Sequence, residues 1–337
     1  MPSIKDVARY VGYSTSTVSR VINQDKAVSP ATRKKILRAI GDLGYKPNLI
    51  AQGLRVRKGR LIGLAVPEGT IHAFSLISQF ALEAARGLGF NIIIVNTHED
   101  PDLEKRSIED LLRRNINGII LSRVSDESRI VRDILRQEIP IVVIDRAFED
   151  ERVSNVVLNN HRAGQLAGEH LLSLGHTRIA CVTGSMNIAL CRERLKGFRD
   201  ALQRQGVELP DRSIFEGTFD YDSGILGAKK FADSGCTAIW AMNDIMAYGV
   251  LKQLHRQGIR VPEDISLMGM DDSEFAEMIT PSLTTVHYPL KELAETAVAI
   301  VVEQVEAGTV NPQPQTVVLE PRLTIRESTG RCRELPQ

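Results

Sequence analysis

Charged and amide side chains follow several apolar segments in the larger part of the chain, and their chemistry suits a sugar. The segments PIVVI, TAIWAM and DISLMG each lead into such side chains, and an arginine lies in the segment after RIACVTG. A carboxylate, an amide or a guanidinium group can each bind two neighbouring hydroxyls. If these groups converge in a cleft, they form a binding site for a polyol. The candidates are Asp145, Arg146, Arg194, Asn243 and Asp271.

Three aromatic residues are candidates to cover the apolar face of a sugar ring, namely Phe74, Phe219 and Tyr288. Two acids beside the polar candidates have a simpler explanation. Asp272 comes just before a segment that begins a predicted helix, so it is a candidate helix cap, and capping is also the alternative for Asp271. Asp244 is expected to cap the helix IMAYGVLKQLHRQG rather than to bind a ligand.

The elements that must position these groups are parallel strands. From Leu61 onward, apolar segments rich in Val and Ile alternate with amphipathic helices, which is typical of an α/β fold whose strands are buried on both faces. In open α/β sheets, ligands bind beyond the carboxyl ends of the strands, where the polar candidates lie. The predicted strands are LIGLAV, NIIIV, NGIIL, PIVVI, NVVLN, RIACVT, TAIWAM and DISLMG.

Enzyme and metal motifs are missing from the sequence. No lysine directly follows a glycine, so a Walker A phosphate loop is excluded, and no G-x-S-x-G segment occurs. The four cysteines do not form C-x-x-C pairs and are expected to be reduced thiols in a reducing compartment. We therefore expect no catalytic residue, no metal and no cofactor.

The net charge of zero conceals a strong asymmetry. Residues 1–60 contain 13 lysines and arginines but only three acids, whereas residues 61–337 contain 29 basic and 39 acidic residues. A small basic head on an acidic body favours contact with a polyanion at one end of the molecule, although charge alone also fits a basic solvated surface.

The basic head has the pattern of a helix-turn-helix. Ser3, Ser14 and Ser29 are each placed to cap a helix, and Gly12 and Gly44 are placed to end the first and third. In the third helix, Ile36, Leu37, Ile40 and Leu43 are expected to point inward. In the second, TSTVSRVIN, valines cluster on one face, and helical spacing places Ser16 and Arg20 opposite them.

A helix with small hydroxyl side chains can lie close to the bases of a major groove. Arg20 can donate two hydrogen bonds to a guanine, with Thr15, Ser16 and Thr17 beside it; the alternative for Arg20 is simple exposure to solvent. Basic residues on the other helices would contact phosphates and position the head without recognising sequence. These candidates are Lys5, Arg9, Lys34, Lys35 and Arg38.

The segment D-V-A-x-x-x-G-x-S-x-x-T-V-S-R-V-I-N, which begins at Asp6, resembles the signature of the LacI/GalR family of bacterial repressors. Tyr45-Lys46-Pro47-Asn48, with Ala51 and Leu54, is similar to the hinge of that family. The resemblance implies a homodimer on a palindromic operator, with hinge segments in the minor groove. It also implies that Asn48 and Leu54 contact DNA, and that Leu54 wedges between base pairs and bends the duplex.

For the body, the resemblance implies two lobes similar to type I periplasmic sugar-binding proteins. The chain would cross between the lobes near Asn160, Tyr288 and Glu320. Five of the polar and aromatic candidates match positions of the family's effector pocket, namely Asp145, Arg194, Phe219, Asn243 and Asp271. Asp145-Arg146 resembles the pair that binds ring hydroxyls in ribose-type binding proteins, whereas Tyr288 stands where many relatives have glutamine. The alternative for Arg194 is a salt bridge buried between the lobes.

We therefore expect a helix-turn-helix domain (residues 1–45), a hinge (46–60), a two-lobed α/β domain for effector binding and dimerisation (61–328) and a tail (329–337). The predicted function is a cytoplasmic transcription regulator, most simply a repressor, controlled by a small sugar-like effector. No apolar run is long enough for a membrane helix, so no membrane contact is expected. The alternatives are a cytoplasmic sugar sensor whose head docks on an acidic protein, and a sugar-metabolising enzyme with a regulatory head.

Overall fold

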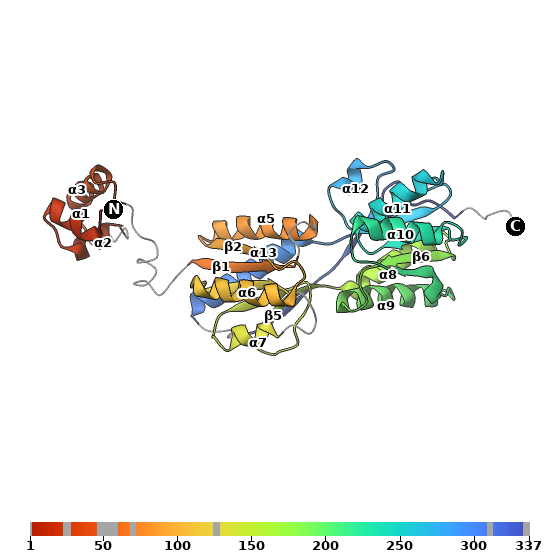
Figure 1. The fold of residues 1–337 in the computed structure, drawn as a ribbon, viewed down its shortest axis with the longest axis horizontal. Helices are drawn as coiled ribbons and strands as arrows, with labels where there is room; N and C mark the ends of the chain where they lie inside the picture. Colours follow the sequence, from red (N-terminus) through yellow and green to blue (C-terminus); the bar gives the residue numbers. More distant parts are fainter. Residues whose placement is uncertain are drawn as a thin grey trace. The chain divides into compact units, whose positions relative to one another are not determined.

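The computed structural model describes residues 2–22, 28–45, 60–67, 72–123, 129–308 and 313–332. The chain divides into two compact units, residues 1–59 and 60–337 (Figure 1). Each unit is described by itself. In the described part of the chain, no helix is long and apolar enough to cross a membrane.

The first unit is a bundle of short helices, as the sequence predicts. Its described helices are α1 (Ile4–Val11), α2 (Thr15–Ile22) and α3 (Pro30–Asp42). Ser3 forms a capping box with Asp6 at the start of α1, and the Oγ atoms of Ser14 and Ser29 accept hydrogen bonds from the amides of Thr17 and Thr32. One expectation is wrong: Leu37 is 52 % exposed, because Ala39 instead turns inward with Ile36.

Lobe 1 of the second unit is built on a parallel sheet. Among the described residues this sheet has six strands in the order β11-β5-β4-β3-β1-β2, and every pair in it is parallel. The helices α5 (His72–Gly87) and α13 (Leu290–Ala307) pack together on one face, and α6 (Pro101–Arg113) and α7 (Ile130–Leu135) lie on the other. The strands are β1 (Leu61–Val66), β2 (Asn91–Asn96), β3 (Gly118–Ser122), β4 (Ile141–Ile144), β5 (Ser154–Leu158) and β11 (Thr316–Leu319).

Lobe 2 repeats this arrangement. Its described strands lie in the order β12-β10-β9-β8-β6-β7, and only β12 runs antiparallel to its neighbour. The helices form two packed pairs, α8 (Asn160–Ser173) with α9 (Ala189–Gln203) and α10 (Tyr221–Phe231) with α11 (Asp244–Arg256). The remaining elements are β6 (Ile179–Thr183), η1 (Asp211–Ser213), β7 (Ile214–Glu216), β8 (Ala238–Ala241), β9 (Ser266–Asp271), α12 (Phe275–Met278), β10 (Thr284–His287) and β12 (Arg322–Thr324).

The chain passes between the lobes at three places, which agree with those that the family resemblance implies. It leaves lobe 1 after β5 and enters α8 at Asn160, returns after β10 through Tyr288 into α13, and leaves again between β11 and β12 at Glu320. Two of the crossings are tied together, because Asn159 Nδ2 donates to the Glu320 carboxylate at 3.0 Å. Figure 1 shows the lobes side by side along these connections.

Candidate functional site

The exposed face of α2 carries the side chains that the sequence assigns to DNA. Val18 and Val21 are buried in the helical core, whereas Thr15, Ser16 and Arg20 are exposed. Thr17 is half-buried, and its hydroxyl lies 2.9 Å from Ser14 Oγ, so it supports the start of the helix as well as bordering this face. The helical unit therefore presents a small, polar surface with an arginine in its last turn.

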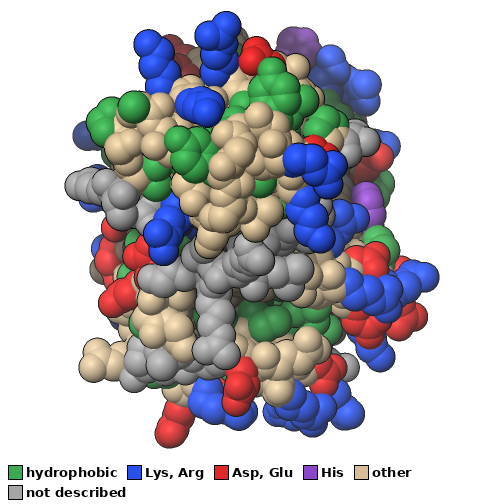
Figure 2. Space-filling view, turned by 90° about the vertical axis from the view of Figure 1, so that its left-hand side faces the viewer, with side chains coloured by type: hydrophobic (Ala, Val, Ile, Leu, Met, Phe, Trp, Pro, Cys, Tyr) green, Lys and Arg blue, Asp and Glu red, His purple; other side chains and the backbone are tan. Residues whose placement is uncertain are grey.

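Basic side chains on the other helices are exposed too. Lys5 of α1 and Lys34 and Arg38 of α3 are open to solvent, and the Lys35 ammonium lies 5.5 Å from the centre of the Tyr13 ring. The space-filling view from the side of the helical unit shows Lys and Arg side chains standing out from the surface (Figure 2). Such a surface suits phosphate contacts. The predicted contacts of Asn48 and Leu54 lie outside the described residues.

In the second unit, a cavity between the lobes is lined by all eight side chains that the sequence assigns to an effector. This cavity, called here the inner pocket, has a volume of about 60 Å³. It lies beyond the carboxyl ends of β4, β8 and β9, where the doubly wound topology leaves room for a ligand. Its lining comprises Ala73, Phe74, Ile77, Glu99, Asp145, Arg146, Leu190, Arg194, Phe219, Asn243, Asp271 and Tyr288.

The lobe 1 wall of the inner pocket is organised around Asp145 and Arg146. Asp145 has a φ of 65°, a left-handed conformation that orients its side chain at the end of β4. The hydroxyl of Tyr288 donates to Asp145 Oδ1 at 3.2 Å, so the crossing segment positions this carboxylate. Arg146 is buried, and its guanidinium lies 3.4 Å from the carboxylate of Glu99.

The lobe 2 wall is organised around Arg194 and Asn243. Arg194 is 4 % exposed, and it donates to Asn160 Oδ1 at 2.8 Å and to the Met242 carbonyl at 3.0 Å. Asn243 caps α11 through Oδ1, while Nδ2 donates to the Phe219 carbonyl at 2.8 Å. A Cβ atom at Gly184 would collide with the Phe219 ring, so this glycine gives the ring its place.

Asp271 lies at the end of β9 with a φ of 119°. Removal from water, and next the neighbouring Asp244 carboxylate, raise the pKa of Asp271 well above its ordinary value. Arg194 opposes this effect. The carboxyl group of Asp271 is placed to form hydrogen bonds with a ligand hydroxyl in the inner pocket.

Asp244 and Asp272, which directly follow the pocket residues Asn243 and Asp271 in the chain, lie outside the inner pocket. The expectation that Asp244 caps α11 is wrong, because the helix is capped one residue earlier, by Asn243. Asp244 is instead buried, and burial raises its pKa to about 6. For Asp272, burial alone would raise the pKa, but hydrogen bonds from His287 and Arg326 lower it to about 2. Asp272 therefore acts as the partner of these basic groups.

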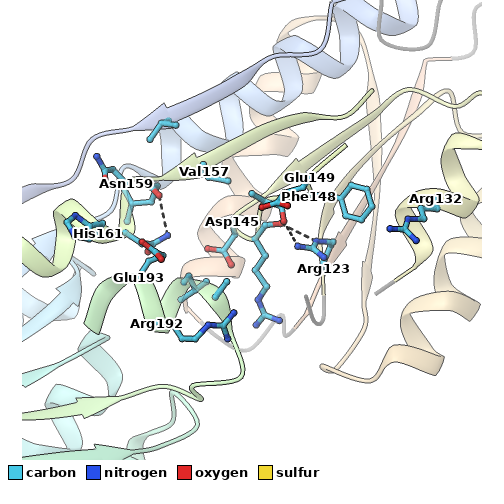
Figure 3. Close-up of a pocket in the computed structure, with 17 residues that line it drawn as sticks. Arg123, Arg132, Asp145, Phe148, Glu149, Val157, Asn159, His161, Arg192 and Glu193 are labelled. Carbon is cyan, nitrogen blue, oxygen red and sulfur yellow. Dashed lines mark hydrogen bonds between the residues drawn. The ribbon is translucent and has the colours of Figure 1, made fainter. Parts of the chain in front are cut away.

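A larger cavity of about 670 Å³ adjoins the inner pocket and shares Asp145, Arg146 and Leu190 with it. In this outer chamber, Arg123 and Phe148 of lobe 1 lie across from Arg192 and Glu193 of lobe 2 (Figure 3). The Arg123 guanidinium donates to the carbonyls of Arg146 and Ala147, which fixes the turn after β4. The outer chamber is thus a larger space between the lobes beside the inner pocket.

Sequence reasoning missed four lining residues of the inner pocket, namely Ala73, Ile77, Glu99 and Leu190. Three of them are apolar or small residues on helices, and such residues carry no signal that separates a pocket wall from a core. Glu99 lies on the turn after β2, and a charged residue beyond the carboxyl end of a strand is a signal that could have found it. Among the described residues, no group of three or more His, Cys, Asp or Glu could hold a metal ion.

The fold and the two sites together define a DNA-binding protein with a ligand-binding body. The model for "Bacterial regulatory proteins, lacI family" matches residues 3–48, and the model for "Periplasmic binding protein-like domain" matches residues 168–329. The chain is 33 % identical over 332 residues to the HTH-type transcriptional repressor PurR of Vibrio vulnificus (strain CMCP6), covering 97 % of this chain and 98 % of the relative. It is 33 % identical over 331 residues to the ribose operon repressor of Escherichia coli (strain K12), covering 97 % and 100 %.

Solved structures agree with these relatives. The Lac repressor dimer bound to operator and the anti-inducer ONPF is similar with a TM-score of 0.87 at 29 % identity, over 98 % of this chain and 99 % of the other. The complex of the transcriptional regulator CelR with cellobiose is similar with a TM-score of 0.74 at 30 % identity, over 97 % and 100 %. The chain belongs to the lacI family of bacterial regulatory proteins. It is a DNA-binding transcriptional repressor controlled by a small effector, and not an enzyme.

Proposed function

We propose that the protein works in the cytoplasm as a homodimeric repressor that binds a palindromic operator through Arg20 and its neighbours and responds to a neutral monosaccharide in the inner pocket. In this proposal, residues 46–60 form the hinge between the DNA-binding head and the body, as the sequence predicts. The observation that carries the proposal is the convergence of Asp145, Arg194 and Asp271 on one pocket between the lobes. D-ribose is the first candidate, since it fits the Asp145-Arg146 pattern.

The charge of the inner pocket favours a neutral ligand. Its two guanidinium groups, Arg146 and Arg194, share the pocket with the carboxyl groups of Glu99, Asp145 and Asp271, and the Arg146 guanidinium lies 3.4 Å from the Glu99 carboxylate. A phosphate or carboxylate on the ligand would therefore meet no uncompensated positive charge. Among the relatives, one is named a ribose operon repressor, and a similar solved regulator from Enterococcus faecium contains bound ribose.

A thermal-shift screen tests this assignment. D-ribose and other neutral pentoses are compared with cellobiose, D-ribose 5-phosphate and D-gluconate. A ligand at 100 times its Kd stabilises the folded protein by about 2.7 kcal/mol, which is a readily measured rise in Tm. We expect a neutral monosaccharide to raise Tm and the charged sugars to leave it unchanged. Stabilisation by the charged sugars alone would contradict the proposal.

Exposed apolar side chains on lobe 2 support the homodimer. Met278 is 69 % exposed, Phe275 45 % and Tyr221 40 %. Tyr221 also borders a cavity of about 680 Å³ that includes Leu251 and Ile279 in its lining. Exposed apolar side chains of this size are typical of an interface between protein chains. We assign them to contact with a second copy of the chain.

The change Met278→Glu should therefore weaken the dimer, because it would place a charge in an apolar interface. Sedimentation equilibrium is expected to give a monomer for the variant at concentrations where the unaltered protein is a dimer. Operator affinity should fall with it, since one head holds only one half-site. Ile325→Glu, at a side chain that is 63 % exposed in another part of the lobe, is the control. A Met278→Glu protein that remains dimeric would remove this surface from the proposal.

A further inference from the structure

Two consecutive acids at the edge of the inner pocket have unusual backbone conformations. Asp271 has a φ of 119° and Asp272 a φ of 61°, in the region that favours glycine. Residues in such conformations persist only when the surrounding structure holds them. Asp271 faces the pocket, so whatever holds this turn also fixes the geometry of a ligand-binding carboxylate.

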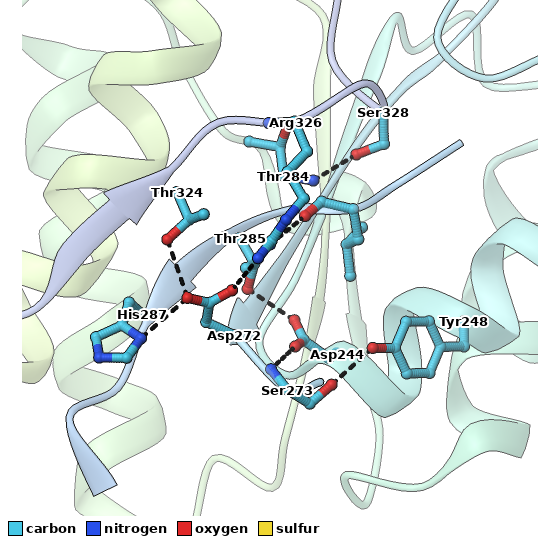
Figure 4. Close-up of polar contacts among 11 residues, drawn as sticks. Asp244, Tyr248, Asp272, Ser273, Thr284, Thr285, His287, Thr324, Arg326 and Ser328 are labelled. Carbon is cyan, nitrogen blue, oxygen red and sulfur yellow. Dashed lines mark hydrogen bonds and ion pairs between the residues drawn. The ribbon is translucent and has the colours of Figure 1, made fainter. Parts of the chain in front are cut away.

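One side of the turn is held by Asp272. Its carboxylate accepts hydrogen bonds from Arg326 Nη2 at 2.7 Å, His287 Nδ1 at 3.0 Å and the Thr324 hydroxyl at 3.1 Å. These partners come from β10, from β12 and from the segment that follows β12. They anchor Asp272 to the sheet (Figure 4), and none of the three partners lines the inner pocket.

The other side is held by Asp244, in the first turn of α11. Asp244 is 1 % exposed and is not part of the pocket lining. Its Oδ2 accepts from the backbone amide of Ser273 at 2.8 Å, and its Oδ1 accepts from the Thr285 hydroxyl at 2.7 Å (Figure 4). The backbone of Asp244 also lowers the pKa of Asp271, so the two residues are close.

The Asp244 side chain is closely packed against β9. A Cβ atom at Gly269 of β9 would collide with Asp244 Oδ1 and with Leu283, so a glycine is required beside the buried carboxylate. Ser273 is held a second time, since its hydroxyl lies 2.7 Å from the Tyr248 hydroxyl of α11. The turn after β9 is thus bound to α11 at Ser273, through Asp244 and Tyr248.

We infer that Asp244 is a positioning residue of the effector site: it ties Ser273 of the turn to Thr285 of β10 and thereby holds Asp271 in its ligand-facing conformation. The inference rests on the proposed function, because it takes the inner pocket to be the effector site. Asp244 touches no ligand. It links two pocket residues, since it follows Asn243 in the chain and binds the amide of Ser273, two residues after Asp271.

The first test needs no ligand. Asp244→Ala removes the acceptor of the Ser273 amide, so hydrogen exchange at Ser273 should become at least about tenfold faster, as expected for the loss of a hydrogen bond to a charged group. A crystal structure of the variant should show Asp271 relaxed to a negative φ. Asp244→Asn keeps an oxygen for the Ser273 amide and should retain slow exchange. Unchanged exchange and an unchanged Asp271 φ in Asp244→Ala would overturn the inference.

The second test measures affinity with D-ribose as the probe. Asp244→Ala should weaken binding on the order of 10- to 100-fold, as for residues that orient ligand-binding groups, and Asp244→Asn should restore most of the affinity. The matched control is Ser266→Ala. It removes a buried hydroxyl of β9 that forms hydrogen bonds with Gly330, away from the turn. An equal loss in Ser266→Ala would indicate a merely structural effect and contradict the inference. If the unaltered protein binds no sugar, the proposed function fails, while the exchange experiment still decides the role of Asp244.

Discussion

Replacing Arg194 with methionine is expected to abolish the response to sugar while leaving a folded protein that still binds its operator. Arg194 is the buried cation that opposes the acidic environment of Asp271, and its guanidinium joins α9 to Asn160 at the first crossing between the lobes. Truncating a buried, hydrogen-bonded charge in a binding site costs about 3 kcal/mol of binding free energy, or roughly 100-fold in affinity. The change therefore removes both a ligand-binding group and a link between the lobes.

The measurement is titration calorimetry with the sugar found in the thermal-shift screen, followed by operator binding with and without that sugar. Arg192→Met is the matched control, because Arg192 lies on the same helix but is exposed and lines the outer chamber. Arg194→Lys keeps the charge but not the two-sided hydrogen bonding, and it should not restore affinity. Thermal unfolding of each variant separates loss of binding from loss of fold. Retention of sugar affinity in Arg194→Met would exclude the inner pocket as the effector site.

Strands that contain a buried apolar run could be predicted from the sequence. All eight predicted strands occur, and β3, β4, β6 and β8 are buried along their whole length. Of the strands that were missed, β7, β11 and β12 are partly exposed strands at the edges of the sheets, and β10 lies between β9 and β12. Such segments are extended because neighbouring strands pair with them, as Thr285 pairs with both Gly269 and Thr324. A pairing partner distant in the chain leaves no local pattern.

Pocket residues could be predicted where a polar residue type coincides with the carboxyl end of a strand. Asp145, Asn243 and Asp271 all follow strands, and parallel strands bring their carboxyl ends to one edge. The division of roles within Asn243-Asp244 could not be predicted, because it depends on where α11 begins. Helix ends shift by a residue with tertiary context, and that one residue decides which side chain caps the helix and which is buried against Ser273.

The head carries the second large prediction, which concerns base recognition by Arg20. This residue lies in the last turn of α2, exposed, on the face opposite the buried Val18 and Val21. A bidentate contact between arginine and guanine contributes about 1–3 kcal/mol of discrimination against another base. Arg20→Ala should therefore lower affinity for the preferred operator by roughly 5- to 150-fold and remove the preference at a single base pair in each half-site.

The operator is first selected from a pool of random duplexes with the unaltered protein, and fluorescence anisotropy then measures binding to single-base variants of it. Lys34→Ala is the matched control, because Lys34 is an exposed cation on α3 that we assign to phosphate. Its loss should weaken all duplexes alike and reduce the dependence of log Kd on log salt concentration by about one contact. If Arg20→Ala instead weakened every duplex equally, Arg20 would be a phosphate contact, and base recognition would belong to the hydroxyl side chains Thr15, Ser16 and Thr17.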